Sequence, residues 1–158
     1  MKKIVVIEAL KFALEGKLYE AKAAADSARQ DAIHEQSAAE TQYDSLSIES
    51  GYLAEGQSER VEQAIRAIHQ FEASYNLNPE PHIVEGALVQ IADEAESKSW
   101  YYIGPAEGGL KIQIAQTQVM VLTVASPLGQ VLYRKCLEDE IEFNFNGRTQ
   151  YLYVDAIL

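Results

Sequence analysis

The stretch from His34 to Arg60, HEQSAAETQYDSLSIESGYLAEGQSER, sets the architecture of this chain. It predicts the end of one helix, a turn built around residues 43–47, and a second helix that runs back. The flanking sequence, from about Ile4 to Tyr75, contains no proline and is rich in Ala, Glu, Gln and Ser, a composition compatible with long helices. Because Asp44 stands in the predicted turn, the hairpin would carry a carboxylate at its tip.

Both predicted arms carry apolar residues at three- and four-residue spacing, which is typical of amphipathic helices. The stripes comprise Leu10, Leu14, Leu18, Ala21, Ala25 and Ala28 in the first arm, and Leu53, Val61, Ala64, Ile65, Ile68 and Phe71 in the second. Small residues in such a stripe let two helices pack closely, as in an antiparallel coiled coil. Arms of roughly 30 to 40 residues would be about 45–60 Å long, too long and thin for a globule, so we expect the hairpin to project.

The second half of the chain predicts strands. Two prolines and two asparagines in residues 76–81 indicate a stop and a linker. β-Branched and aromatic residues then dominate six segments, namely 87–91, 99–103, 110–114, 119–124, 139–145 and 150–157. Asn146-Gly147 predicts a tight hairpin, and Ser126-Pro127 predicts the cap and first turn of a short helix over residues 126–135.

The expected fold class is therefore α+β in two parts. An N-terminal antiparallel coiled-coil hairpin would occupy residues 1–76, followed by a linker over 77–83. A small, mainly antiparallel sheet domain with one short helix would occupy residues 84–158. The length of 158 residues and a hydrophobic content of 47% suffice for one medium domain or two small ones.

The net charge limits the kinds of partner that the chain is expected to bind. With 24 acidic and 13 basic residues the net charge is −11, which argues against free nucleic acid, because its phosphates are bound chiefly through Lys and Arg. A basic protein surface or a metal-loaded site is better suited, although acidity can also simply keep a protein soluble. No apolar run approaches the roughly 18 residues that span a membrane. Glu8 and Lys11 interrupt the apolar start, so we expect a cytoplasmic protein.

Sulfur and imidazole chemistry has little support in the sequence. Cys136 is the only cysteine, which excludes an intrachain disulfide and a thiolate metal cluster. No histidine is near it in sequence, so we expect a buried structural cysteine rather than a nucleophile. The three histidines are scattered without metal-ligand spacing.

Two segments resemble the bacterial Gre family of transcript-cleavage factors. The first is Ala125-Ser126-Pro127-Leu128-Gly129-Gln130-Val131-Leu132, followed by the acidic turn Glu138-Asp139-Glu140-Ile141 and a last strand. The second is the hairpin segment with Tyr43-Asp44, Ile48-Glu49 and Gly51-Tyr52-Leu53-Ala54-Glu55-Gly56-Gln57, which is more similar to the Gre-like proteins of proteobacteria than to the principal cleavage factors. The resemblance covers nearly the whole chain.

The resemblance implies an FKBP-like second domain that docks beside the secondary channel of RNA polymerase. Ser126, Pro127, Leu128 and Gly129 would form the polymerase-binding turn. The hairpin would enter the channel and bring Asp44 and Glu49 to the active site, where they would help to hold a Mg²⁺ ion shared with the polymerase. Carboxylates suit this task because Mg²⁺ takes hard oxygen ligands. The chain would be an accessory factor rather than an enzyme, with no cofactor of its own, only indirect contact with nascent RNA, and a monomeric state.

One departure from the family pattern concerns the tip acids. The principal factors place an Asp and a Glu three residues apart in an Asp-Leu-Ser-Glu run, whereas here Ser47 stands three residues after Asp44 and the next acid is Glu49. Residues five apart on a continuous helix differ by about 140° in direction, so the two acids would converge only if residues 45–47 break the helix. Glu40 and Asp44 do share a face. Two modes of action remain open: stimulating cleavage of backtracked RNA, or occupying the channel without cleavage.

Each candidate residue also has a purely structural explanation. Asp44 suits the N-cap of the second helix, and Glu49 suits its first turn through the helix dipole. Tyr43 and Tyr52 bracket the tip and are expected to pack on each other rather than on RNA. Ser126-Pro127 suits plain helix capping. Two further function classes stay open, namely an FKBP-like peptidyl-prolyl isomerase, on fold analogy alone, and a coiled-coil adaptor.

Overall fold

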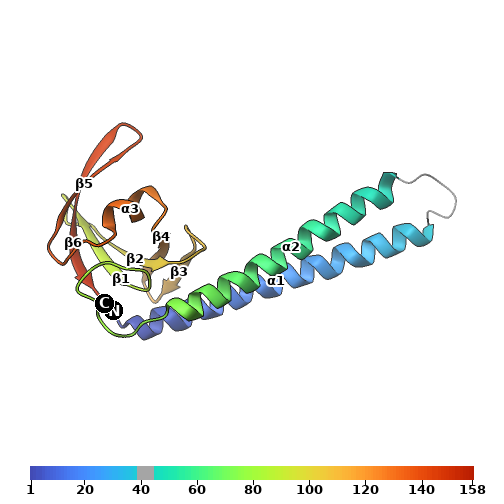
Figure 1. Ribbon diagram of the computed structural model, residues 1–158, viewed down its shortest axis with the longest axis horizontal. Helices are drawn as coiled ribbons and strands as arrows, with labels where there is room; N and C mark the ends of the chain where they lie inside the picture. Colours follow the sequence, from blue (N-terminus) through green and yellow to red (C-terminus); the bar gives the residue numbers. More distant parts are fainter. Residues whose placement is uncertain (39–44) are drawn as a thin grey trace. The chain divides into compact units, whose positions relative to one another are not determined.

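The structure is a computed structural model that describes residues 1–38 and 45–158 of the chain. It contains two long helices followed by a six-stranded sheet with one short helix (Figure 1). By internal contacts the chain divides into two compact units. One comprises Phe12–Ile68, and the other comprises Met1–Lys11 together with His69–Leu158. Both long helices therefore begin or end inside the unit that contains the sheet. No helix among the described residues is long and apolar enough to cross a membrane.

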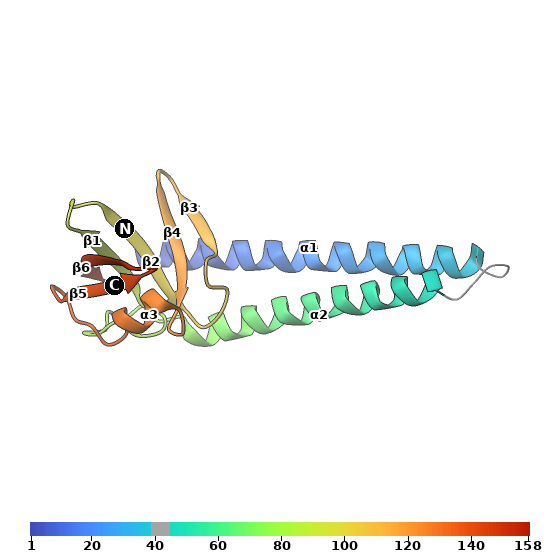
Figure 2. The ribbon, with the colours of Figure 1, turned by 90° about the horizontal axis from the view of Figure 1, so that it is seen from above.

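The helical unit is an antiparallel pair. Helices α1 (Lys3–Ala38) and α2 (Ser45–Ser74) lie side by side through Phe12–Ile68 (Figure 2). Leu14 and Ala28 of α1 are buried, at 3% and 6% exposure, as the spacing of the first stripe predicts. Leu53 is a correction to the second stripe, because it is 57% exposed.

Near the N-terminal end of α2, the half-buried face of the helix is formed by residues other than those that the sequence predicted. Ala54 and Gln57 are half-buried, and the next half-buried positions are Val61 and Ala64. These four residues recur at steps of three, four and three, which keeps one face of the helix toward α1. Leu53 is one position off that face, so its apolar character misled the prediction.

Helix α2 begins earlier in the sequence than expected. Helix α2 begins at Ser45, so residues 45–47, which would have to break the helix for Asp44 and Glu49 to converge, are helical. Serine is well tolerated in the first turn of a helix, and the segment contains no glycine or proline to interrupt it. Asp44 and Tyr43 lie outside the described residues.

The sheet contains all six predicted strands. They are β1 (Leu88–Asp93), β2 (Lys98–Gly104), β3 (Lys111–Ile114), β4 (Thr117–Thr123), β5 (Glu140–Phe145) and β6 (Arg148–Ile157). The order across the sheet is β3-β4-β2-β1-β6-β5. Four of the neighbouring pairs are antiparallel, and β2 with β4 is parallel. The expected α+β class, with a helical hairpin followed by a small sheet domain and one short helix, is confirmed.

Two local predictions in this domain are also confirmed. Asn146 and Gly147 join β5 to β6 with φ values of 51° and 76°, the positive angles that a tight two-residue hairpin turn requires. Helix α3 (Pro127–Leu132) begins after Ser126, as predicted. It ends three residues before the predicted end, because Tyr133 is its C-cap and Arg134 adopts a φ of 65°, which a helix cannot continue through.

Aromatic packing ties the helix ends to the sheet inside their common unit. The rings of Phe71 in α2 and Tyr102 in β2 stack with centroids 6.1 Å apart, and both side chains are fully buried. A Cβ atom on Gly104 would lie 2.8 Å from Val121 and 2.9 Å from the Phe71 ring. Glycine at this position therefore lets Phe71 approach the strand backbone.

Burial raises the pKa of Tyr102 to about 12 from its ordinary value of 10. The folded protein thus holds the phenol proton more tightly than the unfolded chain does, and stability from this group is present below pH 10 and lost as the pH rises toward about 12. We expect the free energy of unfolding to fall across this range, and to fall less steeply in Tyr102→Phe. Urea unfolding at several pH values measures this, and equal slopes for the two proteins would contradict it.

Candidate partner-binding surface

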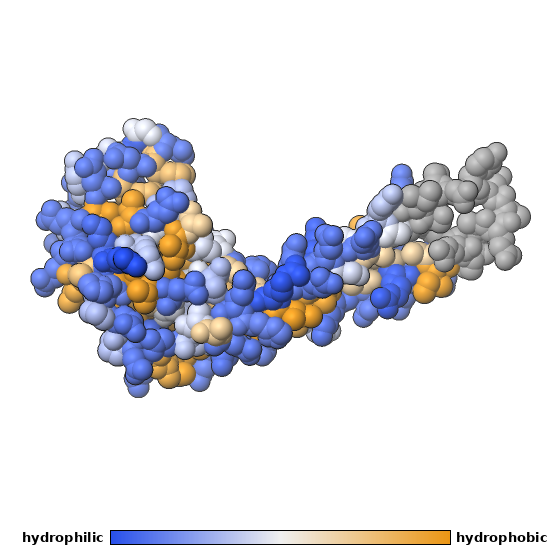
Figure 3. All heavy atoms as spheres, viewed as in Figure 1, coloured by the Kyte–Doolittle hydropathy of each residue, from blue (hydrophilic) through white to orange (hydrophobic). Residues whose placement is uncertain are grey.

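A hollow of about 360 Å³ opens on the sheet domain between the β1–β2 turn, the β5–β6 hairpin and α3. Its wall comprises Ile91, Ala92, Asp93, Glu94, Ala95, Ser97, Ser99, Tyr101, Leu128, Phe143, Gln150, Tyr151 and Leu152. Figure 3 shows apolar residues, in orange, grouped on the sheet domain among polar ones. The hollow combines aromatic, aliphatic and carboxylate groups, which makes it a candidate for function.

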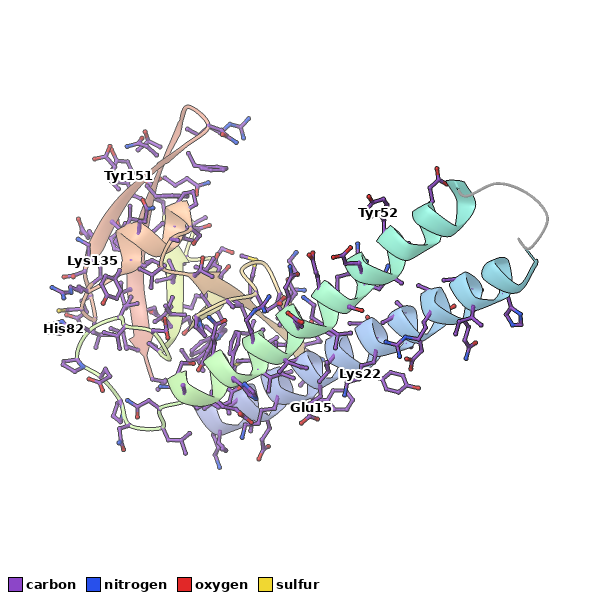
Figure 4. All side chains as sticks on the ribbon, turned by 45° about the vertical axis from the view of Figure 1, so that its right-hand side comes forward. Glu15, Lys22, Tyr52, His82, Lys135 and Tyr151 are labelled. Carbon is purple, nitrogen blue, oxygen red and sulfur yellow. The ribbon has the colours of Figure 1, made fainter. Side chains whose placement is uncertain are left out.

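The aromatic wall is set by strand alternation. Successive residues of a strand point to opposite faces, so Tyr102 of β2 packs on Phe71 while Tyr101 lines the hollow on the other face. Phe143 of β5 is half-buried and stacks on Phe145 with centroids 5.9 Å apart. Tyr151 lies on the β5–β6 hairpin and is 48% exposed (Figure 4). Two of the rings are therefore held against the core, and the third is available to a partner.

The β1–β2 turn holds the polar side of the hollow in place. The Asp93 carboxylate oxygen Oδ1 accepts hydrogen bonds from the backbone N–H of Ala95 at 2.9 Å and of Ser97 at 2.8 Å. The Asp93 carboxylate is thus engaged in hydrogen bonds within the turn, whereas the neighbouring Glu94 is exposed to solvent. An apolar wall with an acidic rim suits an apolar side chain of a partner protein flanked by basic groups.

The predicted docking turn is built around a helix cap. The hydroxyl oxygen Oγ of Ser126 accepts a hydrogen bond from the Gly129 N–H at 3.1 Å and donates one to the Thr123 carbonyl at 2.7 Å. Pro127 occupies the first helical position. Of the four residues predicted to bind a partner, only Leu128 lines the hollow. Ser126, Pro127 and Gly129 shape the turn that places it there.

Sequence reasoning missed the aromatic members of this surface. Tyr101, Phe143 and Tyr151 all fall within predicted strands, and nothing in the sequence marks them as members of one surface. The alternation of Trp100, Tyr101 and Tyr102 already implies two different faces. What the sequence does not show is that α3 leaves one of these faces partly open.

The predicted tip site is only partly described. Glu49 lies in the first turns of α2 and is exposed, and Tyr52 is 70% exposed. Asp44 and Tyr43 lie outside the described residues. Within residues 1–38 and 45–158, no group of three or more His, Cys, Asp or Glu side chains could hold a metal ion. The proposed Mg²⁺ role of Asp44 and Glu49 stays a prediction.

Cys136 differs from the sequence-based expectation. It is half-buried rather than buried, and its sulfur lies 3.1 Å from Nδ1 of His82. The two residues form an isolated antiparallel bridge, flanked by the Ile83 N–H, which donates to the Lys135 carbonyl at 2.8 Å. His82 and Lys135 can be followed in Figure 4. The histidine arrives through the fold, 54 residues away in sequence, so neighbourhood in the sequence was a poor guide.

Comparison with known proteins gives structural matches alone. No protein-family model and no curated protein sequence matches the chain. Solved structures that align with it include the transcription factor Gfh1, with 16% identity, a TM-score of 0.40 and coverage of 94% of this chain and 93% of that one. Gfh1, or GreA factor homolog 1, of Thermus thermophilus aligns with 17% identity and a TM-score of 0.39 over 94% of both chains. Thermus aquaticus Gfh1 aligns with 18% identity and a TM-score of 0.41 over 95% of this chain and 94% of that one. At these identities and TM-scores no functional residue is transferred from them.

The cap that places Leu128 depends on a glycine. A Cβ atom on Gly129 would collide with the carbonyl oxygen of Thr123 and lie 2.8 Å from the Ser126 hydroxyl. We expect Gly129→Ala to destabilise the sheet domain by about 1–3 kcal/mol through overpacking. Fluorescence of Trp100, the single tryptophan, follows unfolding of this domain. Gly108→Ala is the matched control, because the nearest atom to its Cβ would be 3.4 Å away. Equal loss of stability in both variants would show that the cap is not the cause.

Proposed function

We propose that this chain is a Gre-like regulator that binds RNA polymerase at its secondary channel. The observation that carries the proposal is the turn at Ser126-Pro127-Leu128-Gly129. It forms the capped helix start that the sequence resemblance implies, and it presents Leu128 to an aromatic-lined hollow. The same domain follows a long helical hairpin. The function would arise from docking by the sheet domain and from placing the hairpin in the channel.

The chemistry of the hollow supports a protein partner. Its volume of about 360 Å³ accommodates one or two apolar side chains, and an exposed tyrosine at the edge is a frequent source of binding energy. The net charge of −11 and the exposed Glu94 favour a basic surface around the docked side chain. Such complementarity accelerates association and orients the partner.

Of the two modes of action, we propose occupation of the channel without stimulated cleavage. Residues 45–47 belong to α2 and do not provide the break that would let Glu49 converge with Asp44 if Asp44 continued the same helix. Glu49 therefore points from a helix rather than from a loop. This favours a hairpin that enters the channel without delivering a pair of carboxylates to one Mg²⁺ ion.

Binding to purified core polymerase tests the docking surface. We expect Tyr151→Ala to weaken binding about tenfold, because it removes an exposed ring from the edge of the hollow. Tyr133→Ala is the control, since Tyr133 is 38% exposed on the same domain and does not line the hollow. Failure of the unmodified chain to bind polymerase at low salt would refute the proposed function.

RNA cleavage in backtracked elongation complexes tests the mode of action. We expect the chain to bind without accelerating cleavage, and Asp44→Ala and Glu49→Ala to behave like the unmodified chain. Stimulated cleavage that both variants lose, with binding retained, would instead assign the two acids to metal-assisted hydrolysis.

One observation favours a second candidate function. An FKBP-like peptidyl-prolyl isomerase needs an apolar pocket for a proline ring, and the hollow offers Tyr101, Phe143 and Leu128 as its wall. The candidate otherwise rests on fold analogy. A proline-isomerisation assay with a short peptide separates the two. Catalysis that Phe143→Ala abolishes would support the isomerase, and absence of catalysis with retained polymerase binding supports the regulator.

A further inference from the structure

The outward face of α1 carries a second apolar seam that no described part of the chain covers. Phe12 and Tyr19 are 80% and 76% exposed, and they lie two turns apart on one side of the helix. Between and beyond them come Gly16 and Ala23, also exposed, and a Cβ atom on Gly16 would meet nothing within 4 Å. We call Phe12, Gly16, Tyr19 and Ala23 the outer seam.

The spacing of the outer seam is that of a coiled coil. Its members follow each other at steps of four, three and four residues, which repeats every seven. At ~100° per residue, the outer seam points about 160° away from Leu14, which is buried. Large aromatic residues alternate with the smallest residues, so the seam offers both knobs and the spaces that receive them. Isolated exposed apolar residues are ordinary, but this regular alternation is not.

Charged residues run along one flank of the outer seam in a polarised order. Glu8, Glu15, Lys22 and Arg29 follow at seven-residue steps and are all exposed. Figure 4 labels Glu15 and Lys22 on α1. The acidic pair lies in the first half of this row and the basic pair in the second. Such a row is complementary to a copy of itself that runs in the opposite direction.

A second copy that runs antiparallel can pack against the outer seam and pair the charged residues in the same register. When Phe12 of one copy faces Ala23 of the other, Gly16 faces Tyr19, so each ring meets a small residue. The same register sets Glu15 against Lys22 of the second copy and Glu8 against Arg29. A parallel arrangement would instead bring Glu15 close to Glu20 of the other copy, which repels. The outer seam and its charged row therefore favour a second copy of this chain as the binding partner.

We propose that the outer seam is the interface of an antiparallel homodimer with twofold symmetry. Each contact then occurs twice, as in other self-complementary interfaces. Four aromatic side chains bury on the order of 600–1,000 Å² in total, near the lower limit of roughly 1,000 Å² for a specific interface. The dimer would accordingly be reversible and dependent on concentration. This inference does not depend on polymerase binding, and it differs from the monomeric state that the sequence resemblance implies.

Sedimentation velocity over a concentration series tests the seam. We expect the full chain to shift from monomer to dimer as its concentration rises, and Tyr19→Ser to weaken association at least about tenfold. Tyr52→Ser is the matched control, because Tyr52 is 70% exposed on α2 and lies off the seam. Circular dichroism verifies that helix content is retained. A chain that stays monomeric to millimolar concentration, or equal weakening by Tyr19→Ser and Tyr52→Ser, would overturn the proposal.

Charge reversal tests the direction of pairing. Glu15→Lys alone and Lys22→Glu alone should each lower self-association, because like charges then face each other. Mixing these two variants should restore a dimer, since each reversed residue meets an opposite charge in the antiparallel register. The double variant Glu15→Lys with Lys22→Glu should also dimerise as the unmodified chain does. A mixture that remains monomeric would rule out this register.

Discussion

The stacked rings of Phe71 and Tyr102 are the contact on which the sheet-containing unit depends. They join the last turns of α2 to a central strand, and Gly104 allows the approach by having no side chain. Both rings are fully buried, so the ends of the helices are part of the folded core rather than appendages to it. A mutation that loosened this pair would affect the sheet and the base of the hairpin together.

The two faces of the sheet serve different purposes because side chains alternate along β2. Tyr102 is used for stability, and Tyr101 on the opposite face contributes to the hollow beside α3. Helix α1 shows a similar division, since Leu14 is buried and Phe12 is exposed to solvent. In both β2 and α1, one face of the element is packed in the core and the other face is accessible to a partner. Our proposals for polymerase docking and for self-association rest on the accessible faces.

The sequence was informative wherever a local rule controls the backbone. Strand patterns, the Asn146-Gly147 turn and the Ser126 cap were predictable because each depends on a few neighbouring residues. Properties that depend on distant segments were not. The parallel pairing of β2 with β4, the His82–Cys136 contact and the hollow itself arise only when segments far apart in the chain meet. Leu53 illustrates the remaining difficulty, since one position of register decides whether a leucine is buried.

The place of β6 in the sheet has a consequence for synthesis in the cell. Although it is the last strand of the chain, β6 lies between β1 and β5 rather than at an edge. While residues 148–157 are still inside the ribosome, β1 has an unpaired side and β5 has no partner. The nascent sheet domain therefore exposes strand edges until residues 148–157 have left the ribosome, a state prone to aggregation. A premature stop that removes this one strand would leave two open edges at the middle of the sheet, where a missing edge strand would leave one.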